Sequence, residues 1–336
     1  MKFALHFGNN TFSDPEGARR LVRLAEAAGF DSVFAVEHVV FPDNYTSVYP
    51  YAPGGRLPGG PSMKFPDPLI WLTWAAAATT RLRFMTAVMI LPQRNPLVLA
   101  KEVATLDYLS GGRIELGIGV GWLKEEFEAL GIPFERRGKR ADEYVAVMRA
   151  LWASDGASFA GEFVNFDKVS CNPKPVAKSV PIVVGGHSEA AARRAGRLGD
   201  GFFPSIGAQV DTMPLLDVVR RSAEQAGRDP AMVELILGCP GALPNSGSDP
   251  ARSRRGAHCA RCGPPCLASD GVHVRSRNDA GPFRRGDHQA LRERVKPGIT
   301  ARLNDRIHRS AIKIMRPIIS SVKSQIGTMG LAGIRA

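Results

Sequence analysis

Apolar residues recur along residues 1–238 in two alternating patterns, short β-like runs and longer segments with helical spacing. Seven short runs predict strands, and continuous apolar runs such as PIVVGG suit strands that are buried on both faces. The predicted strands are Lys2–Phe7, Ser32–Glu37, Leu82–Leu91, Arg113–Ile118, Pro181–Val184, Gly201–Pro204 and Val233–Leu237. Because amphipathic helices separate these strands, the pattern predicts a parallel sheet covered by helices.

The predicted helices begin at recognisable capping residues. Ser13 or Asp14 caps the first helix, Asn95 a later one and Ser188 another, each close to the first apolar residue of the helical pattern. Glycines end these helices, at Gly29, Gly111 and Gly199. Strict alternation of strand and helix favours an α/β fold of the (β/α)8 TIM-type barrel class, with an open doubly wound sheet as the competing arrangement.

Length favours the barrel, because about 250 residues is typical for that fold. No pattern of an eighth strand or a last helix can be recognised after residue 238, so the barrel is predicted to be incomplete at its C-terminus. The domain division that follows is a barrel over residues 1–238 and an atypical tail over residues 239–336.

The tail carries the whole charge excess of the chain, which has a net charge of +12. Residues 1–238 hold 26 basic and 26 acidic side chains, whereas residues 239–336 hold 18 and 6. The tail is rich in Arg, Gly, Pro, Ser and Cys and lacks a clear helical or strand period over residues 239–297. It is interpreted either as disordered or as a shifted reading frame of GC-rich DNA, and we prefer the shifted frame.

The tail does not indicate a metal or nucleic-acid function. His258 and the cysteines Cys259, Cys262 and Cys266 lack the paired spacing and the regular framework that structural zinc sites have, so no metal site is expected. A nucleic-acid-binding segment would interleave aromatic and basic residues, and Phe283 is the only aromatic residue after residue 238. We therefore expect no nucleic-acid partner.

No targeting or membrane segment is evident in the sequence. The N-terminal run MKFALHFGNN is too short for a signal peptide, and nowhere do 18 uncharged apolar residues occur together. The expected localisation is cytoplasmic, with no membrane partner.

Two polar residues stand at the end of the second predicted strand, where the loops of a β/α barrel carry reactive groups. His38 can take or give a proton near neutral pH, and the adjacent Glu37 can fix its surroundings. A purely structural His38 that bonds a loop is an equal alternative. The segment 42–68 follows, with seven prolines, four glycines and three of the five tyrosines, and is predicted to be a lid over the barrel mouth, with a disordered insertion as the alternative.

Glycines follow two further predicted strands. Gly117, Gly119 and Gly121 in RIELGIGVGW lack the spacing and the position of a dinucleotide-binding fingerprint, although bare backbone still allows close approach of a flat or anionic ligand. In PIVVGGHSEAA, Gly185 and Gly186 precede a helix and suit a phosphate. Plain turns are the alternative at both places.

Several stretches together resemble the luciferase-like monooxygenase superfamily, and within it the oxidoreductases that use the deazaflavin coenzyme F420. The stretches are VFAVEHVVFP, FMTAVMILPQRNPLVLAKEVATLDYLSGGRIELGIGVGW, PKPVAKSVPIVVGGHSEAAARRAGRLGDGFFP and MVELILG. The resemblance runs through residues 1 to 240 and implies a barrel whose mouth holds an isoalloxazine-like ring. Its phosphate tail would lie at the two glycine-containing turns described above, which we call the glycine corners.

The resemblance also assigns roles by position. It implies that His38 is the proton donor or acceptor beside the ring and that Glu37 supports the coenzyme site. A bulge with a non-proline cis peptide is expected at Thr86-Ala87. The remaining coenzyme contacts that it implies are Gly119, Val120 and Gly121 on one corner and Gly185, Gly186 and His187 on the other. Trp122 stands where the sugar-phosphate dehydrogenases of the family have a glutamate, which disfavours that activity.

The function expected from these features is an F420-dependent oxidoreductase that transfers a hydride to or from a small organic substrate. An FMN-dependent monooxygenase is the alternative within enzymes, because both coenzymes would occupy the same site at the barrel mouth. A cofactor-binding protein without catalysis, or a damaged gene product with an altered C-terminus, is the alternative outside enzymes. The expected partners are a small-molecule substrate and, as an alternative to a monomer, a second copy of the chain.

Overall fold

The computed structural model describes residues 2–52, 54–60, 62–204, 212–239 and 272–276 of the chain. The strands are β1 Lys2–Leu5, β2 Ser32–Ala35, β3 Arg83–Thr86, β4 Met89–Ile90, β5 Ile114–Gly119, β6 Ala157–Ala160, β7 Asn165–Val169, β8 Ile182–Gly185, β9 Gly201–Phe203, β10 Glu234–Cys239 and β11 Val272–Ser276. The helices are α1 Gly8–Thr11, α2 Pro15–Ala27, α3 Pro68–Ala76, α4 Pro96–Ser110, α5 Lys124–Ala129, α6 Arg137–Ala153, α7 Glu189–Leu198 and α8 Met213–Gln225, with short 3-10 turns η1 Leu91–Gln93 and η2 Pro230–Met232.

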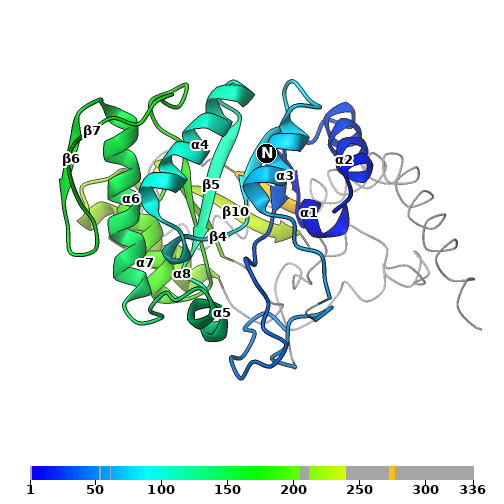
Figure 1. Ribbon diagram of the computed structural model, residues 1–336, viewed down its shortest axis with the longest axis horizontal. Coiled ribbons are helices and arrows are strands. Elements are labelled where there is room, and N and C mark those ends of the chain that lie inside the picture. Colours follow the sequence, from blue (N-terminus) through cyan, green and yellow to red (C-terminus); the bar gives the residue numbers. More distant parts are fainter. Residues whose placement is uncertain (1, 53, 61, 205–211, 240–271, 277–336) are drawn as a thin grey trace, which may run out of the picture. The chain divides into compact units, whose positions relative to one another are not determined.

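The main sheet curls into a barrel. Its strand order is β3-β2-β1-β11-β10-β9-β8-β5-β4, and a further pairing between β3 and β5 closes it. From β1 through β2, β3, β5, β8 and β9 to β10, neighbouring strands are parallel. Helices such as α4 and α6 lie on the outside of this sheet, and β6 and β7 form a separate hairpin beside α6 (Figure 1). The predicted TIM-type α/β fold is confirmed.

Two layers of apolar side chains hold the barrel together. The inner layer is one small cluster to which six strands and the segment after β3 each contribute a residue, namely Ala4, Phe34, Met85, Ala87, Val183, Phe203 and Ile236. A much larger cluster joins the outer faces of the strands to the covering helices. Strands buried on both faces explain the continuous apolar runs of the sequence.

Helix starts follow the sequence signals closely. The side chain of Asp14 caps α2 by accepting from the amide of Gly17, and Asn95 caps α4 by accepting from two amides. Ser188 caps α7 by accepting from the amide of Ala191 at 3.2 Å. These caps satisfy backbone donors that the first helical turn leaves without partners, and they fix where each helix begins after its strand.

The third predicted strand, Leu82–Leu91, is interrupted. It consists of β3 and β4 with Ala87 and Val88 between them, and the peptide bond between these two residues is cis. The expected cis peptide therefore exists, but it lies one residue after Thr86-Ala87. Thr86 is the last residue of β3, and its hydroxyl donates a hydrogen bond to the carbonyl oxygen of Gly117 at 2.7 Å.

The eighth position of the barrel is occupied by β11. It runs antiparallel to both neighbours, with Val274 opposite Phe3 of β1 and opposite Leu237 of β10. The structure differs here from the expectation of a barrel left open between its first and seventh strands. The run VHVRS does alternate apolar and polar residues, but it is too short to stand out in Arg- and Gly-rich surroundings.

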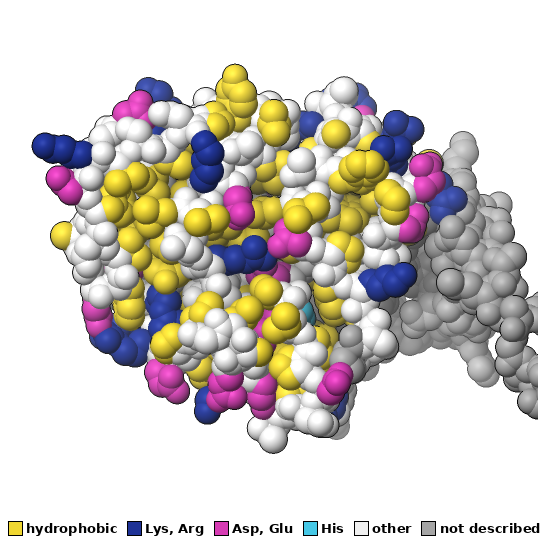
Figure 2. Space-filling model, viewed as in Figure 1, with side chains coloured by type: hydrophobic (Ala, Val, Ile, Leu, Met, Phe, Trp, Pro, Cys, Tyr) yellow, Lys and Arg dark blue, Asp and Glu magenta, His cyan; other side chains and the backbone are white. Residues whose placement is uncertain are grey.

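The rest of the tail, including Cys259, Cys262 and Cys266, lies outside the described residues. Within the described part of the chain, no helix is long and apolar enough to cross a membrane, and no cluster of three His, Cys, Asp or Glu side chains is arranged for a metal ion. On the face drawn in Figure 2, Lys and Arg side chains are interspersed with Asp and Glu side chains.

Candidate functional site

The predicted site residues gather at one end of the barrel. His38 follows β2, Gly119 ends β5 and Gly185 ends β8, and these three strands belong to the parallel part of the sheet. Their carboxyl ends therefore meet at one rim, which we call the mouth. The loop 42–68 and α5 lie at this same end of the barrel (Figure 1). The structure thus brings His38 and both glycine corners together.

His38 is held by an acidic residue that sequence analysis did not single out. Its Nδ1 lies 3.1 Å from Oε2 of Glu126 in α5, and the His38 and Glu126 side chains are 7% and 0% exposed. The other carboxylate oxygen, Oε1, accepts from the backbone amides of Val39 at 2.7 Å and Val40 at 3.3 Å. Glu126 therefore fixes both the imidazole ring and the chain that leaves β2.

Aromatic rings surround His38 edge to face. The ring centroids of Phe41, Phe65 and Trp122 lie 5.3, 5.5 and 5.9 Å from that of the imidazole. Such edge-to-face pairs favour a fixed orientation of each ring. His38 therefore lies in an apolar part of the mouth, where little of its side chain is exposed to water.

The predicted lid reaches from His38 to the second glycine corner. Tyr49 packs on Trp122 with 5.1 Å between ring centroids, and on Tyr51 with 5.3 Å. Tyr51 in turn contacts His187 at 5.1 Å. Burial, followed by the neighbouring Tyr51, raises the pKa of Tyr49 to about 12. Tyr49 is therefore neutral at physiological pH, and the lid offers an apolar and hydrogen-bonding surface to the mouth.

The lid is fastened to α5 by Glu125, the residue before Glu126. Its Oε1 accepts from the amide and hydroxyl of Thr46 at 2.6 and 3.0 Å and from the amide of Ser47 at 3.1 Å. Oε2 accepts from the Ser47 hydroxyl at 2.6 Å. Burial opposes the charged form, but these hydrogen bonds outweigh it and lower the pKa of Glu125 to about 2. Glu125 is therefore ionised wherever the protein is folded near neutral pH.

Glu37 is turned toward other protein groups. Its carboxylate accepts from the amide of Ile90 and from the guanidinium of Arg94, which also bonds Asp67 at 2.9 Å. Burial alone would lower the pKa of Arg94, but the charge of Glu37 and the hydrogen bond to Asp67 raise it above its usual value. The two oxygens of Glu37 thus connect the segment after β2 to Ile90 of β4 and, through Arg94, to Asp67 near the end of the segment 42–68.

The glycines of the first corner make room for protein atoms. A Cβ on Gly117 would lie 1.8 Å from the carbonyl oxygen of Thr86. One on Gly119 would lie 2.6 Å from Cγ2 of Val88, and one on Gly185 would lie 2.5 Å from Cγ1 of the same residue. The side chain of Val88, which follows the cis peptide, therefore takes the space that both corners leave. Val88 packs on the inner cluster and forms the floor of the mouth.

The second corner contains a buried polar atom without a partner. Nδ1 of His187 has no hydrogen bond within the described residues, and burial lowers the pKa of this imidazole. His187 immediately precedes Ser188 and α7, and Gly186 adopts a φ of 126° that favours glycine. The first turn of α7 also contains Glu189, which pairs with Arg193. A neutral imidazole with an unpartnered nitrogen suits a ligand oxygen at this place, whereas the amide of Gly186 already donates to the carbonyl oxygen of Phe203 at 3.1 Å.

Three residues that contribute to the mouth were not predicted from the sequence. Glu126 is one of several carboxylates in LKEEFEAL, and helical spacing alone does not tell which of them is turned inward. Arg94 becomes relevant only because the chain after β4 brings its guanidinium to the carboxylate of Glu37. His6 follows β1 and lies over the inner cluster, where its Nε2 is 3.2 Å from the carbonyl oxygen of Ala87. His6 fell within the predicted strand Lys2–Phe7, and a histidine so close to the end of that strand was a signal that could have been used.

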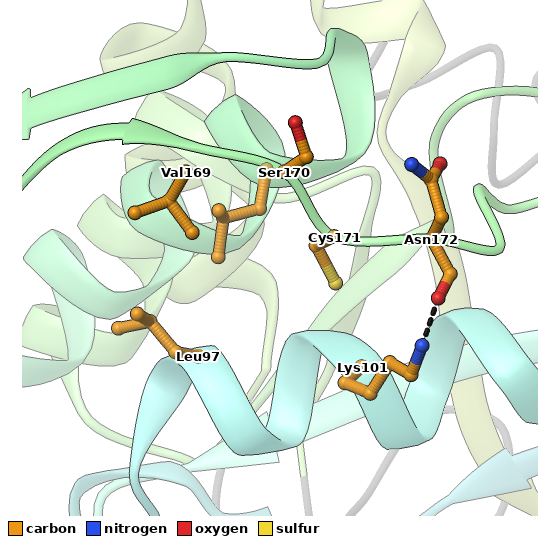
Figure 3. A pocket seen from close by; sticks show the side chains of 7 residues that line it. Leu97, Lys101, Val169, Ser170, Cys171 and Asn172 are labelled. Atoms are coloured by element: carbon orange, nitrogen blue, oxygen red, sulfur yellow. Dashed lines mark hydrogen bonds between the residues drawn. The ribbon is translucent and has the colours of Figure 1, made fainter.

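A separate hollow lies away from the mouth, between α4 and the segment that follows β7 (Figure 3). Its volume is about 460 Å³, and the lining residues are Leu97, Lys101, Leu151, Val169, Ser170, Cys171 and Asn172. The ammonium of Lys101 donates to the carbonyl oxygen of Asn172 across it. None of the predicted site residues lines this hollow.

The chain matches one protein family. The sequence model of the family described as luciferase-like monooxygenase matches residues 3–316. An FMNH(2)-dependent dimethylsulfone monooxygenase of Pseudomonas fluorescens is 34% identical over 202 residues, which cover 57% of this chain and 50% of that protein.

Two solved structures are similar in fold. The monooxygenase RslO1 from Streptomyces bottropensis superposes with a TM-score of 0.61 and 28% sequence identity, over 76% of each chain. An F420-dependent secondary alcohol dehydrogenase in complex with an F420-acetone adduct superposes with a TM-score of 0.56 and 25% identity, over 70% of this chain and 68% of that one. The similar proteins thus include users of both coenzymes.

Proposed function

The chain belongs to the luciferase-like monooxygenase family, and on this premise we propose that it is an F420-dependent oxidoreductase acting on a small organic substrate. The observation that carries the proposal is the pairing of His38 with Glu126 in the mouth. Among the described residues Nδ1 of His38 is bonded, whereas no partner is found for Nε2, so the second ring nitrogen is available to a substrate. Bound F420 supplies a deazaflavin ring that gives or takes a hydride.

The residues of the mouth fit such a coenzyme. The unpartnered Nδ1 of His187 suits an oxygen of its phosphate tail, next to the backbone of Gly186. Val88 and the inner cluster offer an apolar floor to a flat ring. We propose that Gly119, Val120 and Gly121 contribute backbone to the same site, and that Thr86 and Ala87 contribute through the bulge that positions Val88. Glu37 braces the strand that carries His38.

The chain's own groups then orient the substrate and handle a proton. Phe41, Phe65 and Trp122 limit water at His38, so that Nε2 exchanges a proton with the substrate rather than with solvent. Tyr49 and Tyr51 in the lid contact both ends of the mouth and would cover it. The organic substrate is expected to be apolar, as the ring-lined mouth indicates.

An FMN-dependent monooxygenase is the second candidate. It is favoured by the names of two similar proteins, the dimethylsulfone monooxygenase and RslO1. The contacts described here apply to either coenzyme, because both carry a flat tricyclic ring and a phosphate. A coenzyme-binding protein without catalysis would keep the contacts of His187 but would not need His38.

Titration of the purified full chain with F420, FMN and reduced FMN separates these candidates. We expect saturable F420 binding that is at least about tenfold tighter than binding of either flavin, a difference of about 1.4 kcal/mol. The variant His187→Ala should weaken F420 binding, while Lys101→Ala at the outer hollow serves as the matched control and should not. Tight flavin binding without F420 binding would reject the first candidate.

A further inference from the structure

Glu126 has a more specific task than ion pairing, because its two oxygens are used differently. Oε1 is occupied by the backbone amides of Val39 and Val40, and Oε2 is left for Nδ1 of His38. The carboxylate is fully buried in α5, so water does not compete for either oxygen. Glu126 therefore presents one defined hydrogen-bond acceptor to one ring nitrogen.

An ionised carboxylate only accepts hydrogen bonds, whereas a neutral imidazole carries one hydrogen on one of its two nitrogens. A carboxylate oxygen at 3.1 Å from Nδ1 therefore selects the tautomer with hydrogen on Nδ1. Nε2 is then left as a lone-pair acceptor. The hydrogen bond made by one ring nitrogen thus determines what the other nitrogen can do.

We propose that Glu126 is a positioning residue that keeps the hydrogen of neutral His38 on Nδ1 and so makes Nε2 the proton acceptor of the mouth. The proposal rests on the proposed function in one respect, namely that a substrate supplies the proton that Nε2 accepts. When Nε2 takes that proton, His38 becomes a cation whose charge faces the carboxylate of Glu126. The proton can return by the same route.

No other charged group contacts the imidazole among the described residues. The ring contacts of His38 are with Phe41, Phe65 and Trp122, which carry no charge. Glu37 is adjacent in sequence, but its carboxylate faces Arg94 and Ile90. Glu125, adjacent to Glu126, bonds the lid at Thr46 and Ser47. The tautomer of His38 therefore depends on Glu126 alone in this set.

The proposal predicts that the variant Glu126→Gln reverses the tautomer of His38. Glutamine keeps one oxygen, which the two amides of Val39 and Val40 hold, and it replaces the other oxygen by an NH2 group that can only donate. Nδ1 of His38 must then accept, and the ring hydrogen moves to Nε2. Glu126→Gln thus reverses the tautomer while preserving size and shape. In Ser-His-Asp enzymes the equivalent change lowers kcat about 10⁴-fold through the wrong tautomer.

The test uses the full chain with 15N-labelled histidine and long-range proton–nitrogen NMR, which distinguishes the two tautomers directly. Signals of His38 are assigned by their disappearance in His38→Asn. We expect hydrogen on Nδ1 in the wild type, hydrogen on Nε2 in Glu126→Gln, and the wild-type pattern in the matched control Glu125→Gln. Turnover by Glu126→Gln should fall on the order of 10²- to 10⁴-fold, with the affinity for coenzyme kept within about twofold.

Hydrogen on Nε2 in the wild type, or an unchanged tautomer in Glu126→Gln, would overturn the proposal. If the variant does not fold, the wild-type spectrum alone decides. The spectra need no coenzyme, so they stand apart from the proposed function. A wild type with hydrogen on Nδ1 that binds no F420 would keep the role of Glu126 and reject the F420 reaction.

Discussion

His38 is the side chain whose removal separates chemistry from binding. His38→Ala deletes the ring nitrogen that exchanges a proton but leaves the floor at Val88 and the corner at His187 intact. We expect turnover to fall on the order of 10²- to 10⁴-fold, while F420 binding changes by less than about threefold. Steady-state kinetics and a binding titration on the same preparation check this. Unchanged turnover would remove His38 from the mechanism.

One glycine of each corner, Gly119 and Gly185, lies against Val88, and this packing can be tested by rescue. Gly119→Ala would place a methyl group 2.6 Å from Cγ2 of Val88. We expect this variant to lose about 1–3 kcal/mol of unfolding free energy, as overpacked cores do. Urea denaturation measures the loss, and adding Val88→Ala should restore most of it.

Gly54→Ala is the matched control, because a Cβ there meets no atom within 4 Å. It should change stability by less than about 0.5 kcal/mol. If Val88→Ala fails to relieve Gly119→Ala, packing against Val88 is not the reason for this glycine. Contact with a coenzyme would then be the remaining explanation for it.

For single residues, the sequence predicts the position of a polar side chain along a strand better than its contact partners. His38 and Glu37 were both placed at the end of the second strand, which the structure confirms. Adjacent residues on an extended chain point to opposite sides, so one enters the mouth and the other meets Arg94. Glu126 is 88 residues from His38 in sequence, and only the barrel brings the two together.

Among the elements, the short helix α5 controls the lid. Glu125→Ala would remove the four hydrogen bonds that Glu125 accepts from Thr46 and Ser47, and would leave the bond from the Lys124 amide to the Ser47 hydroxyl oxygen. Trypsin can cut the lid after Arg56 and Lys64, so lid opening can be followed by the rate of cleavage at these two sites. We expect this rate to rise on the order of two- to tenfold, because charge-assisted hydrogen bonds are lost from a partly exposed site.

Glu128→Ala is the control for this experiment. Glu128 lies in the same helix and pairs with Lys124 at 3.2 Å on the exposed side, without a contact to the lid among the described hydrogen bonds. Its cleavage pattern should match that of the wild type. Equal cleavage of the Glu125→Ala variant and the wild type would show that the lid is held by its aromatic contacts instead.

The regular elements were largely predictable, and their interruptions were not. The barrel strands up to residue 239 and the helix starts at Asp14, Asn95 and Ser188 follow from apolar spacing and capping, whereas the β6–β7 hairpin was not predicted. The break between β3 and β4 does not follow from spacing, because Ala87 and Val88 are ordinary strand residues in sequence; the family resemblance alone implied a bulge, one residue too early. Only the packing of Val88 between two corners shows why the strand departs from a straight path.

For the whole molecule, the antiparallel strand β11 is the feature on which barrel closure depends. Without it, β1 and β10 would each present an unpaired edge, which favours aggregation. We expect a chain that ends at residue 278 to keep the fold, and a chain that ends at residue 239 to aggregate or lose cooperative unfolding. Size-exclusion chromatography and thermal denaturation of both fragments check this. A soluble, cooperative 1–239 fragment would mean that β11 is dispensable.

The tail shows the limit of sequence reasoning for this chain. Its charge and composition set it apart from residues 1–238, yet β11 lies within the part for which no strand was expected. The choice between a disordered tail and a shifted reading frame stays a prediction, and reading the gene in its neighbouring frame decides it. A stop codon soon after residue 238 in that frame would count against the shift.

The most direct test of the whole account is titration of the 15N-histidine-labelled chain with F420, followed through the signals of His38 and His187. In the proposed complex, His38 lies near the ring of the coenzyme and His187 near its phosphate tail. We therefore expect both sets of signals to change along a single saturation curve, while signals assigned to histidines outside the mouth stay unchanged. Binding that shifts the signals of only one of these two histidines, or of neither, would contradict a shared coenzyme site.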